Sequence, residues 1–268
     1  MNQVRLLFKM WSIQVRSQMQ YRFSFWMDIL STMVLNGSYF LAIALVLERF
    51  ENITGWTLGE VAFLAGMSEL AFGTMDMLFS GYDPDQFSIL VRLGRLDQYL
   101  VRPVNINLQL FGSKFMLRRL GRMFEGAAIL AISFALTSIH WTLWKVIYLP
   151  IVFLSLVLSF GSLFVAGATL IFWTVQPIEA VNILTYGGNE TITYPMTIYP
   201  DWLRKILTYA IPFIFLNYYP ALYFLDKPDP FGMPSFAPFL APAIAVIMLF
   251  LSFRFWNFGL AHYSSTGS

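Results

Sequence analysis

Acidic side chains interrupt the first two long apolar stretches of the chain, where charged groups are unexpected. They are Asp28 in the first stretch and Glu60, Glu69 and Asp76 in the second. Glu69 and Asp76 are seven residues apart, so in a helix they share one face. A carboxylate in apolar surroundings is costly and usually faces protein or water. Either these acids line a pathway and favour cations, or they are structural, pairing with a partner subunit or lying near the end of the stretch.

Residues that could carry catalysis or hold a metal are scarce. There is no cysteine, which excludes disulfides, thiolate catalysis and cysteine-based metal sites. His140 and His262 are isolated, and we interpret both as interfacial residues rather than as ligands or bases. Gly112, Ser113 and Lys114 lack the preceding glycine of a phosphate-binding loop. We therefore expect no enzymatic activity, metal site or bound cofactor in this chain.

The composition is that of an integral membrane protein. Of the 268 residues, 57% are hydrophobic and 12% are charged, and the mean hydropathy is +0.63. A soluble domain has about 25% charged residues, so this chain could not cover a water-facing surface. A membrane crossing needs about 20 apolar residues. The chain is predicted to be all-α, with one six-span domain over residues 23–260 and apolar stretches at residues 23–47, 58–80, 120–138, 141–173, 206–225 and 237–260.

The 17 lysines and arginines orient these helices. Four lie in residues 1–22 and seven in residues 81–122, whereas the loops after the first and third stretches and before the last carry one each. By the positive-inside rule the N-terminus, residues 81–122 and the tail of residues 261–268 are cytoplasmic. This arrangement requires an even number of crossings.

Residues 1–22 are predicted to form an amphipathic helix, centred on residues 3–20, rather than a cleavable signal peptide. Basic residues are spread along the segment, and no apolar core or cleavage site follows in the usual place. Its apolar residues share one face: Val4, Leu7, Phe8, Trp11 and Val15. We expect the helix to lie in the cytoplasmic interface with its bases near anionic headgroups. The alternative is an ordinary cytoplasmic lead-in.

Residues 174–205 allow two topologies. Hydropathy alone makes them a cytoplasmic loop, with Arg204 and Lys205 inside. In the second topology the long fourth stretch breaks near residues 159–161, and residues up to Tyr186 form a polar fifth span. Residues 194–225 then dip into the membrane from outside. Both topologies give six crossings, and a polar span must face protein or water.

Two blocks of residues resemble the permease subunits of type-2 ABC exporters, in particular a bacterial subgroup. The first block follows the second apolar stretch and comprises Gly94, Leu96, Asp97, Tyr99, Leu100, Arg102 and Pro103. The second precedes the last stretch and comprises Tyr194, Pro195, Ile198, Tyr199, Pro200, Leu203, Arg204, Ile211, Pro212, Tyr218, Tyr219, Pro220 and Ala221. The resemblance covers nearly the whole chain, and the motifs are specific when taken in this order.

The resemblance implies an assembly in the bacterial inner membrane. Two permease subunits, identical or paralogous, would form the membrane part, and two ABC ATPase subunits carrying ATP and magnesium would bind beneath them. The assembly would export an amphiphilic or hydrophobic substrate, with membrane lipid but no nucleic acid as a further partner. A secondary transporter driven by an ion gradient is the alternative, which would use the acidic residues but leave residues 85–101 without a purpose.

The cytoplasmic segment of residues 81–119 is the predicted coupling segment. Residues 85–101 are amphipathic, and by resemblance they form the helix that fits a groove in the ATPase. A glycine there allows close approach of another backbone. The implied coupling residues are Phe87, Arg92, Gly94, Arg95, Asp97, Tyr99 and Arg102. The alternative is a juxtamembrane helix whose arginines bind lipid phosphates.

The resemblance also implies that residues 194–225 are re-entrant and form an external gate. Four prolines in this segment fit broken helices better than one clean span. This placement conflicts with the positive-inside interpretation of Arg204 and Lys205. The candidate pathway or gate residues are Glu69, Asp76, Tyr199, Pro212, Tyr218 and Tyr219.

Overall fold

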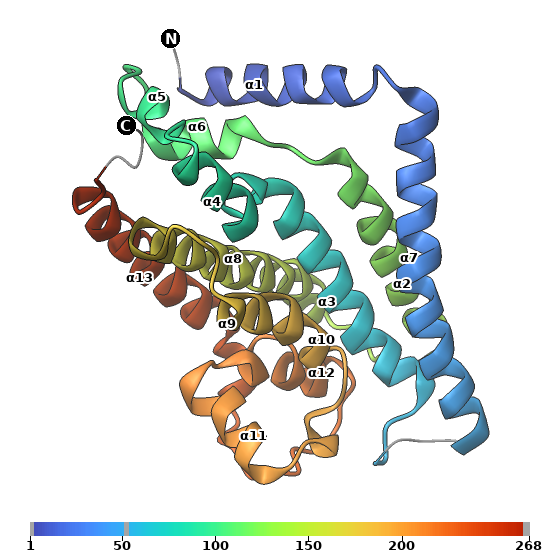
Figure 1. The fold of residues 1–268 in the computed structure, drawn as a ribbon. Helices are drawn as coiled ribbons and strands as arrows, with labels where there is room; N and C mark the ends of the chain where they lie inside the picture. The colour runs from blue at the N-terminus through green and yellow to red at the C-terminus, as the bar shows by residue number, and fades with distance from the viewer. Residues whose placement is uncertain (1–2, 51–53, 265–268) are drawn as a thin grey trace.

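A computed structural model describes residues 3–50 and 54–264, and within them the chain is helical with no strand (Figure 1). The ends of the predicted N-terminal helix and C-terminal tail, residues 1–2 and 265–268, lie outside the described residues. The α-helices are α1 (Gln3–Gln18), α2 (Arg22–Phe50), α3 (Leu58–Leu78), α4 (Pro84–Arg92), α5 (Leu96–Leu100), α6 (Ile106–Ser113), α7 (Leu120–Leu136), α8 (Leu143–Thr174), α9 (Glu179–Asn182), α10 (Gly188–Ile192), α11 (Asp201–Lys205), α12 (Tyr218–Phe224) and α13 (Ala241–Ala261).

Helices α3, α8 and α13 are long and apolar enough to cross a membrane. They are candidate membrane spans by length and composition among the described residues, and six crossings stay a prediction. Helix α2 has 29 residues, whereas α7 has 17 and would extend about 26 Å, slightly less than the hydrocarbon core. The segment after α8 is helical in pieces, with a π-helical turn at Ile183–Gly187 between α9 and α10.

The predicted break near residues 159–161 is wrong, because α8 runs unbroken from Leu143 to Thr174. Gly161 serves packing, since a Cβ there would come within 2.6 Å of the Phe79 ring. The helix ends instead at Val175, whose φ of 60° is left-handed, and Pro177 follows two residues later. The polar segment therefore begins later than predicted and runs past Tyr186 to Ile192.

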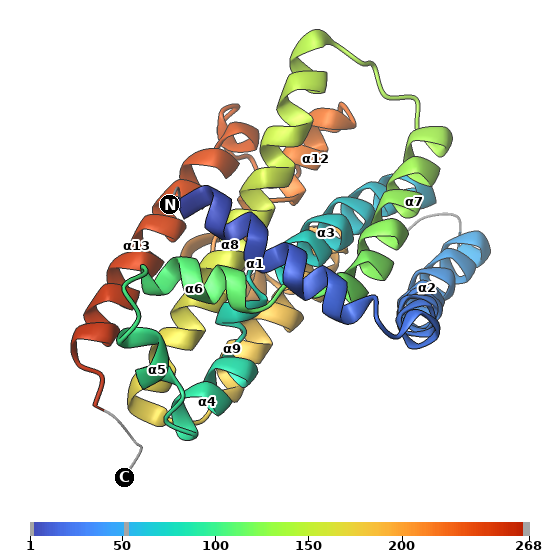
Figure 2. The same cartoon turned by 90° about the horizontal axis from the view of Figure 1, so that it is seen from above.

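Helix α1 lies across the end of the bundle, and α2 descends from it (Figures 1 and 2). Three side chains tie α1 to the backbone of α6 and of the residues just after it. Trp11 donates to the carbonyl of Phe111 at 2.8 Å, and Gln14 donates to that of Ser113 at 2.8 Å. Gln18 donates to the carbonyl of Phe115 at 2.5 Å and accepts from the amide of Leu117 at 2.9 Å. The predicted apolar face is therefore divided, because Trp11 turns toward protein while Val4 and Phe8 stay exposed.

The coupling segment and the predicted gate lie at opposite ends of α3. Helices α4 to α6 follow its C-terminal end, and the segment carrying α11 lies at the other (Figure 1). Near that end, Lys227 pairs with Glu60 at 2.8 Å, and the hydroxyl groups of Thr54 and Thr197 lie 2.6 Å apart. If the coupling segment faces the cytoplasm, the gate segment faces outside.

Helices α3 and α7 pack closely because glycines face the opposing backbone. A Cβ at Gly66 would lie 2.6 Å from the amide nitrogen of Leu130, and one at Gly126 would lie 2.4 Å from that of Leu70. Such contacts let two helix backbones approach within membranes, where small residues replace the hydrophobic driving force. The pair α3–α7 forms the frame to which the polar groups described below are attached.

We expect Gly66→Ala to destabilise the protein, because the added methyl would displace α7. Overpacking of this kind typically costs about 1–3 kcal/mol, more than the roughly 1 kcal/mol gained in helix propensity. Gly187→Ala is the matched control, since a Cβ there meets nothing closer than 3.9 Å. The measurement is the unfolding midpoint in detergent, and a midpoint for Gly66→Ala equal to that of Gly187→Ala would contradict this packing.

Candidate functional site

Residues 85–101 form two helices, α4 and α5, rather than the single helix that the sequence predicted. Gly94 adopts a φ of 63°, which ends α4. Its amide donates to the carbonyl of Val91 at 2.9 Å, and the amide of Arg95 donates to that of Leu90 at 3.0 Å. These two bonds form a Schellman motif, whose left-handed position favours glycine. Gly94 therefore has a structural role: it allows the chain to change direction between α4 and α5.

The N-terminal end of helix α4 is capped, as its C-terminal end is. Asp83 caps it by accepting from the amide of Gln86 at 3.2 Å, and Pro84 occupies the first turn. Burial, together with the neighbouring carboxylates of Asp83 and Glu179, raises the pKa of Asp85. Lys114 donates to the side chain of Gln86, and burial lowers the pKa of Lys114. A helix with both ends specified in this way can act as a rigid lever.

Phe87 faces the interior of this chain, so it does not contact a partner directly, and its part in coupling stays a prediction. It is 1% exposed and packs edge-on against Phe172 of α8 and Trp256 of α13, with ring centroids 5.6 and 5.3 Å away. Val91 and Leu96 are also fully buried. The apolar face of the amphipathic pattern therefore anchors the segment to α8 and α13.

The opposite face of the segment is exposed and mixes apolar with basic side chains. Ile89 is 40% exposed and Leu93 52%. Arg92, Arg95 and Arg102 are exposed as well. No ion pair forms to Arg92 or Arg95 within the part of the chain that the structure describes. We call the five residues Ile89, Arg92, Leu93, Arg95 and Arg102 the coupling surface.

Two of the predicted coupling residues hold the segment in place. The hydroxyl of Tyr263, just after α13, donates to the carboxylate of Asp97 at 3.1 Å. Tyr99 is half-buried, and its carbonyl accepts from the side chain of Gln109 at 2.8 Å. The guanidinium of Arg102 lies 5.3 Å from the centre of the Tyr99 ring. Asp97 and Tyr99 therefore connect α5 to α13 and α6.

The two acids predicted to line a pathway both pair with arginines of this same chain. Glu69 binds Arg122 through two contacts, of 2.5 Å to Nε and 3.0 Å to Nη2. Asp76 lies 2.7 Å from Nε of Arg119. Such pairing favours the structural alternative, although the partner is α7 and its preceding turn rather than a second subunit. Two of the seven cations in residues 81–122 thus fold back onto α3.

A buried polar network extends from Glu69 to α10. Asn189 donates to Oε1 of Glu69 at 2.9 Å and accepts from the hydroxyl of Ser68 at 2.8 Å. Arg122 also lies over the ring of Phe72 at 4.4 Å, and its Nη2 is 3.7 Å from Glu190. The network therefore joins α3, α7 and α10. The sequence predictions missed Asn189 because an asparagine in a polar stretch carries no signal of its partners.

The predicted gate, residues 194–225, is a series of short helices broken at prolines. Pro195 and Pro200 precede the turn Met196–Ile198 and α11, and Pro212 precedes the turn Phe213–Phe215. The hydroxyl of Tyr199 donates to the carbonyl of Thr191 at 2.9 Å. The broken character that the prolines predicted is confirmed, whereas a gating role stays a prediction.

Tyr218 and Tyr219 belong to the core of this segment rather than to its surface. Both are 1% exposed, and Tyr218 lies 5.5 Å from the ring of Trp56. Asn217, which the sequence predictions missed, donates to the carbonyls of Leu64 at 3.0 Å and Ile192 at 2.9 Å. These contacts dock α12 onto α3.

Ion pairs fix the far end of α12. Lys145 of α8 is buried and binds Asp226 at 2.7 Å and the carbonyl of Phe224 at 3.0 Å. Lys227, which follows Asp226 in the sequence, pairs with Glu60 of α3. The adjacent residues Asp226 and Lys227 therefore attach the gate segment to two different helices.

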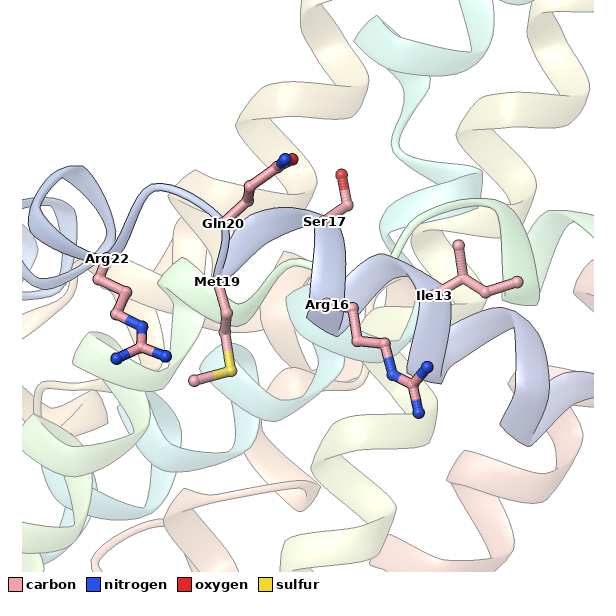
Figure 3. Close-up of a pocket in the computed structure, with 6 residues that line it drawn as sticks. All are labelled: Ile13, Arg16, Ser17, Met19, Gln20 and Arg22. Atoms are coloured by element: carbon pink, nitrogen blue, oxygen red, sulfur yellow. The ribbon is translucent and has the colours of Figure 1, made fainter.

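The elbow between α1 and α2 forms an open hollow with two arginines on its rim (Figure 3). Arg16 and Arg22 both extend along it, with Met19 between them. This arrangement suits the predicted contact with anionic headgroups, which stays a prediction. Within residues 3–50 and 54–264 no group of three acidic or histidine side chains could hold a metal ion.

We expect Arg122→Met to destabilise the protein strongly, because it leaves Glu69 buried without its cation. Breaking one partner of a buried pair typically costs about 3–5 kcal/mol. The double variant Arg122→Met/Glu69→Gln should recover part of the loss, and Arg254→Met, at an exposed arginine of α13, is the control. The unfolding midpoint in detergent checks this, and equal midpoints for Arg122→Met and Arg254→Met would refute it.

Comparison with known proteins gives one family. The family model described as "ABC-2 family transporter protein" matches residues 33–267, which include α3 through α13. No curated protein and no solved structure matches the chain. Because the matched region covers most of the chain, the protein belongs to the ABC-2 transporter family, as the membrane subunit of an ABC transporter.

Proposed function

We propose that this chain is the permease subunit of an ABC exporter whose ATP hydrolysis occurs on a separate ATPase subunit. Two permease subunits and two ATPases, the latter binding ATP and magnesium, would form the assembly in a bacterial inner membrane. Its substrate would be amphiphilic or hydrophobic and would move outward. Family membership supports the transporter class, and the coupling surface supports the position of the ATPase.

The coupling surface is the observation that carries the proposal. Its apolar and basic side chains are exposed, while the reverse face of the same helix is buried against α8 and α13. Aliphatic groups can fill a groove, and unpaired guanidinium groups can bind its carboxylates or backbone carbonyls. Force applied here would reach the membrane helices directly through Phe87, whereas a lipid anchor would not need this rigid attachment.

The external position of the gate segment rests on geometry. Residues 194–225 lie at the end of α3 opposite to the coupling surface (Figure 1). Arg204 pairs with Asp201 and lies 4.2 Å over the ring of Phe231. These contacts hold Arg204 against its own segment and the loop after α12. An ion-gradient mechanism gains no support, because Glu69 and Asp76 are each paired with an arginine.

Reversing charge on the coupling surface should uncouple the ATPase without harming the fold. The double variant Arg92→Glu/Arg95→Glu removes two contacts of about 1–3 kcal/mol each, so ATPase affinity should fall at least tenfold. Insertion and size-exclusion behaviour should stay normal, because both side chains are exposed. The amount of co-purifying ATPase is the measurement.

Arg16→Glu on α1 is the control for a general loss of positive charge, since Arg16 is also exposed. If the double variant keeps its ATPase but loses affinity for anionic lipid, the coupling surface is a membrane anchor and the assignment is wrong.

Single cysteines can test which end faces outside, because the chain has none of its own. Asp201→Cys should react with an impermeant maleimide in intact cells, and Gln98→Cys in α5 should react only after permeabilisation. Both positions are exposed on the protein surface, so labelling depends only on the side of the membrane that each position faces. Protection of residue 201 in intact cells, with labelling after permeabilisation, would restore the cytoplasmic-loop topology.

A further inference from the structure

The segment α9–α10 has one face toward the protein and one that no described element covers. Val181, Thr185, Asn189 and Ile192 are buried. On the other side Ile183 is 63% exposed, and the side chain of Glu190 is 66% exposed. The π-helical turn Ile183–Gly187 lies between them, and both side chains are left on the side that the described residues do not cover. This uncovered side presents an apolar group and a carboxylate.

Glu190 lies at the depth of the middle of α3. Its neighbour Asn189 is hydrogen-bonded to Ser68 and Glu69, and these two residues occupy the central part of the candidate span Leu58–Leu78. An ionisable side chain at such depth costs about 2.5–3.5 kcal/mol if it faces lipid. The exposed face of α10 must therefore face water or protein.

The charges around Glu190 do not cancel. Arg122 is the one cation within 4 Å of Glu69 or Glu190 among the described residues. It is already held by Glu69 through two contacts, whereas its distance to Glu190 is 3.7 Å. Two carboxylates and one guanidinium leave one surplus negative charge. The guanidinium is held by Glu69, so within the described part of the chain Glu190 is the carboxylate without a close cation of its own.

We propose that Glu190 lines the translocation pathway and selects a substrate that carries a positive charge on an apolar body. This inference rests on the proposed function and names its substrate class. A lipophilic cation supplies the missing charge to Glu190 and apolar surface to Ile183. Glu69 and Asp76 hold the helices together, and the selecting carboxylate is a residue that the sequence pattern did not single out.

The test compares two probes of nearly equal shape and opposite charge, tetraphenylphosphonium and tetraphenylborate. Binding is measured by equilibrium dialysis to the purified full chain in nanodiscs, with empty nanodiscs subtracted. Glu190→Gln should weaken tetraphenylphosphonium binding about tenfold or more and leave tetraphenylborate binding unweakened. Glu190→Asp should keep most of the affinity, since it preserves the charge.

Glu179→Gln is the matched control, because Glu179 is an exposed carboxylate at the start of the same segment. The proposal is overturned if Glu190→Gln binds tetraphenylphosphonium as the unmodified chain does, if Glu179→Gln weakens it equally, or if the unmodified chain shows no binding of this cation above empty nanodiscs. The assay contains no ATPase, so its result is independent of the coupling experiment and can fail while the proposed function stands.

Discussion

A guanidinium at membrane depth must be paired, and Arg122 meets this requirement by binding Glu69 on the neighbouring helix. The pair lies among the close contacts between α3 and α7, where glycines leave little room for adjustment. Asn189 then uses the remaining acceptor capacity of Glu69 to bring α10 against the same helices. Because a buried ion pair is weakly stabilising but costly to break, it acts mainly to specify one arrangement of these three elements.

Helix α3 carries acidic residues at three positions along its length, and each pairs with a cation from outside this helix. Glu60 pairs with Lys227 after α12, Glu69 with Arg122 of α7, and Asp76 with Arg119 before α7. The helix thereby links the gate segment at one end to the turn before α7 at the other. Acidic residues are unexpected in an apolar span, and in α3 each of them holds a neighbouring element in place.

The sequence predicted the membrane-protein class and the broken helices of residues 194–225, since apolar length and prolines act locally. It did not predict partners. Glu69 and Arg122 are 53 residues apart, and no spacing rule connects them. A glycine in the sequence likewise does not show whether a helix ends there. Gly161 packs against Phe79 inside an unbroken helix, whereas Gly94 ends α4. Phe87 fits the helical periodicity of the apolar residues in 85–101. That periodicity could not show which face of α4 would be covered by α8 and α13.

The packing around Phe87 explains how a small exposed surface could control distant elements. Phe87 contacts Phe172 and Trp256, and Trp256 also contacts Tyr82, so one aromatic cluster joins α4, α8 and α13. Such a cluster is close-packed and transmits displacement rather than absorbing it. Helix α8 continues from this cluster to Lys145, which holds Asp226 at the end of the gate segment. A movement of α4 by an ATPase would therefore shift α8 as a rod, and its far end would carry the attachment of the gate with it.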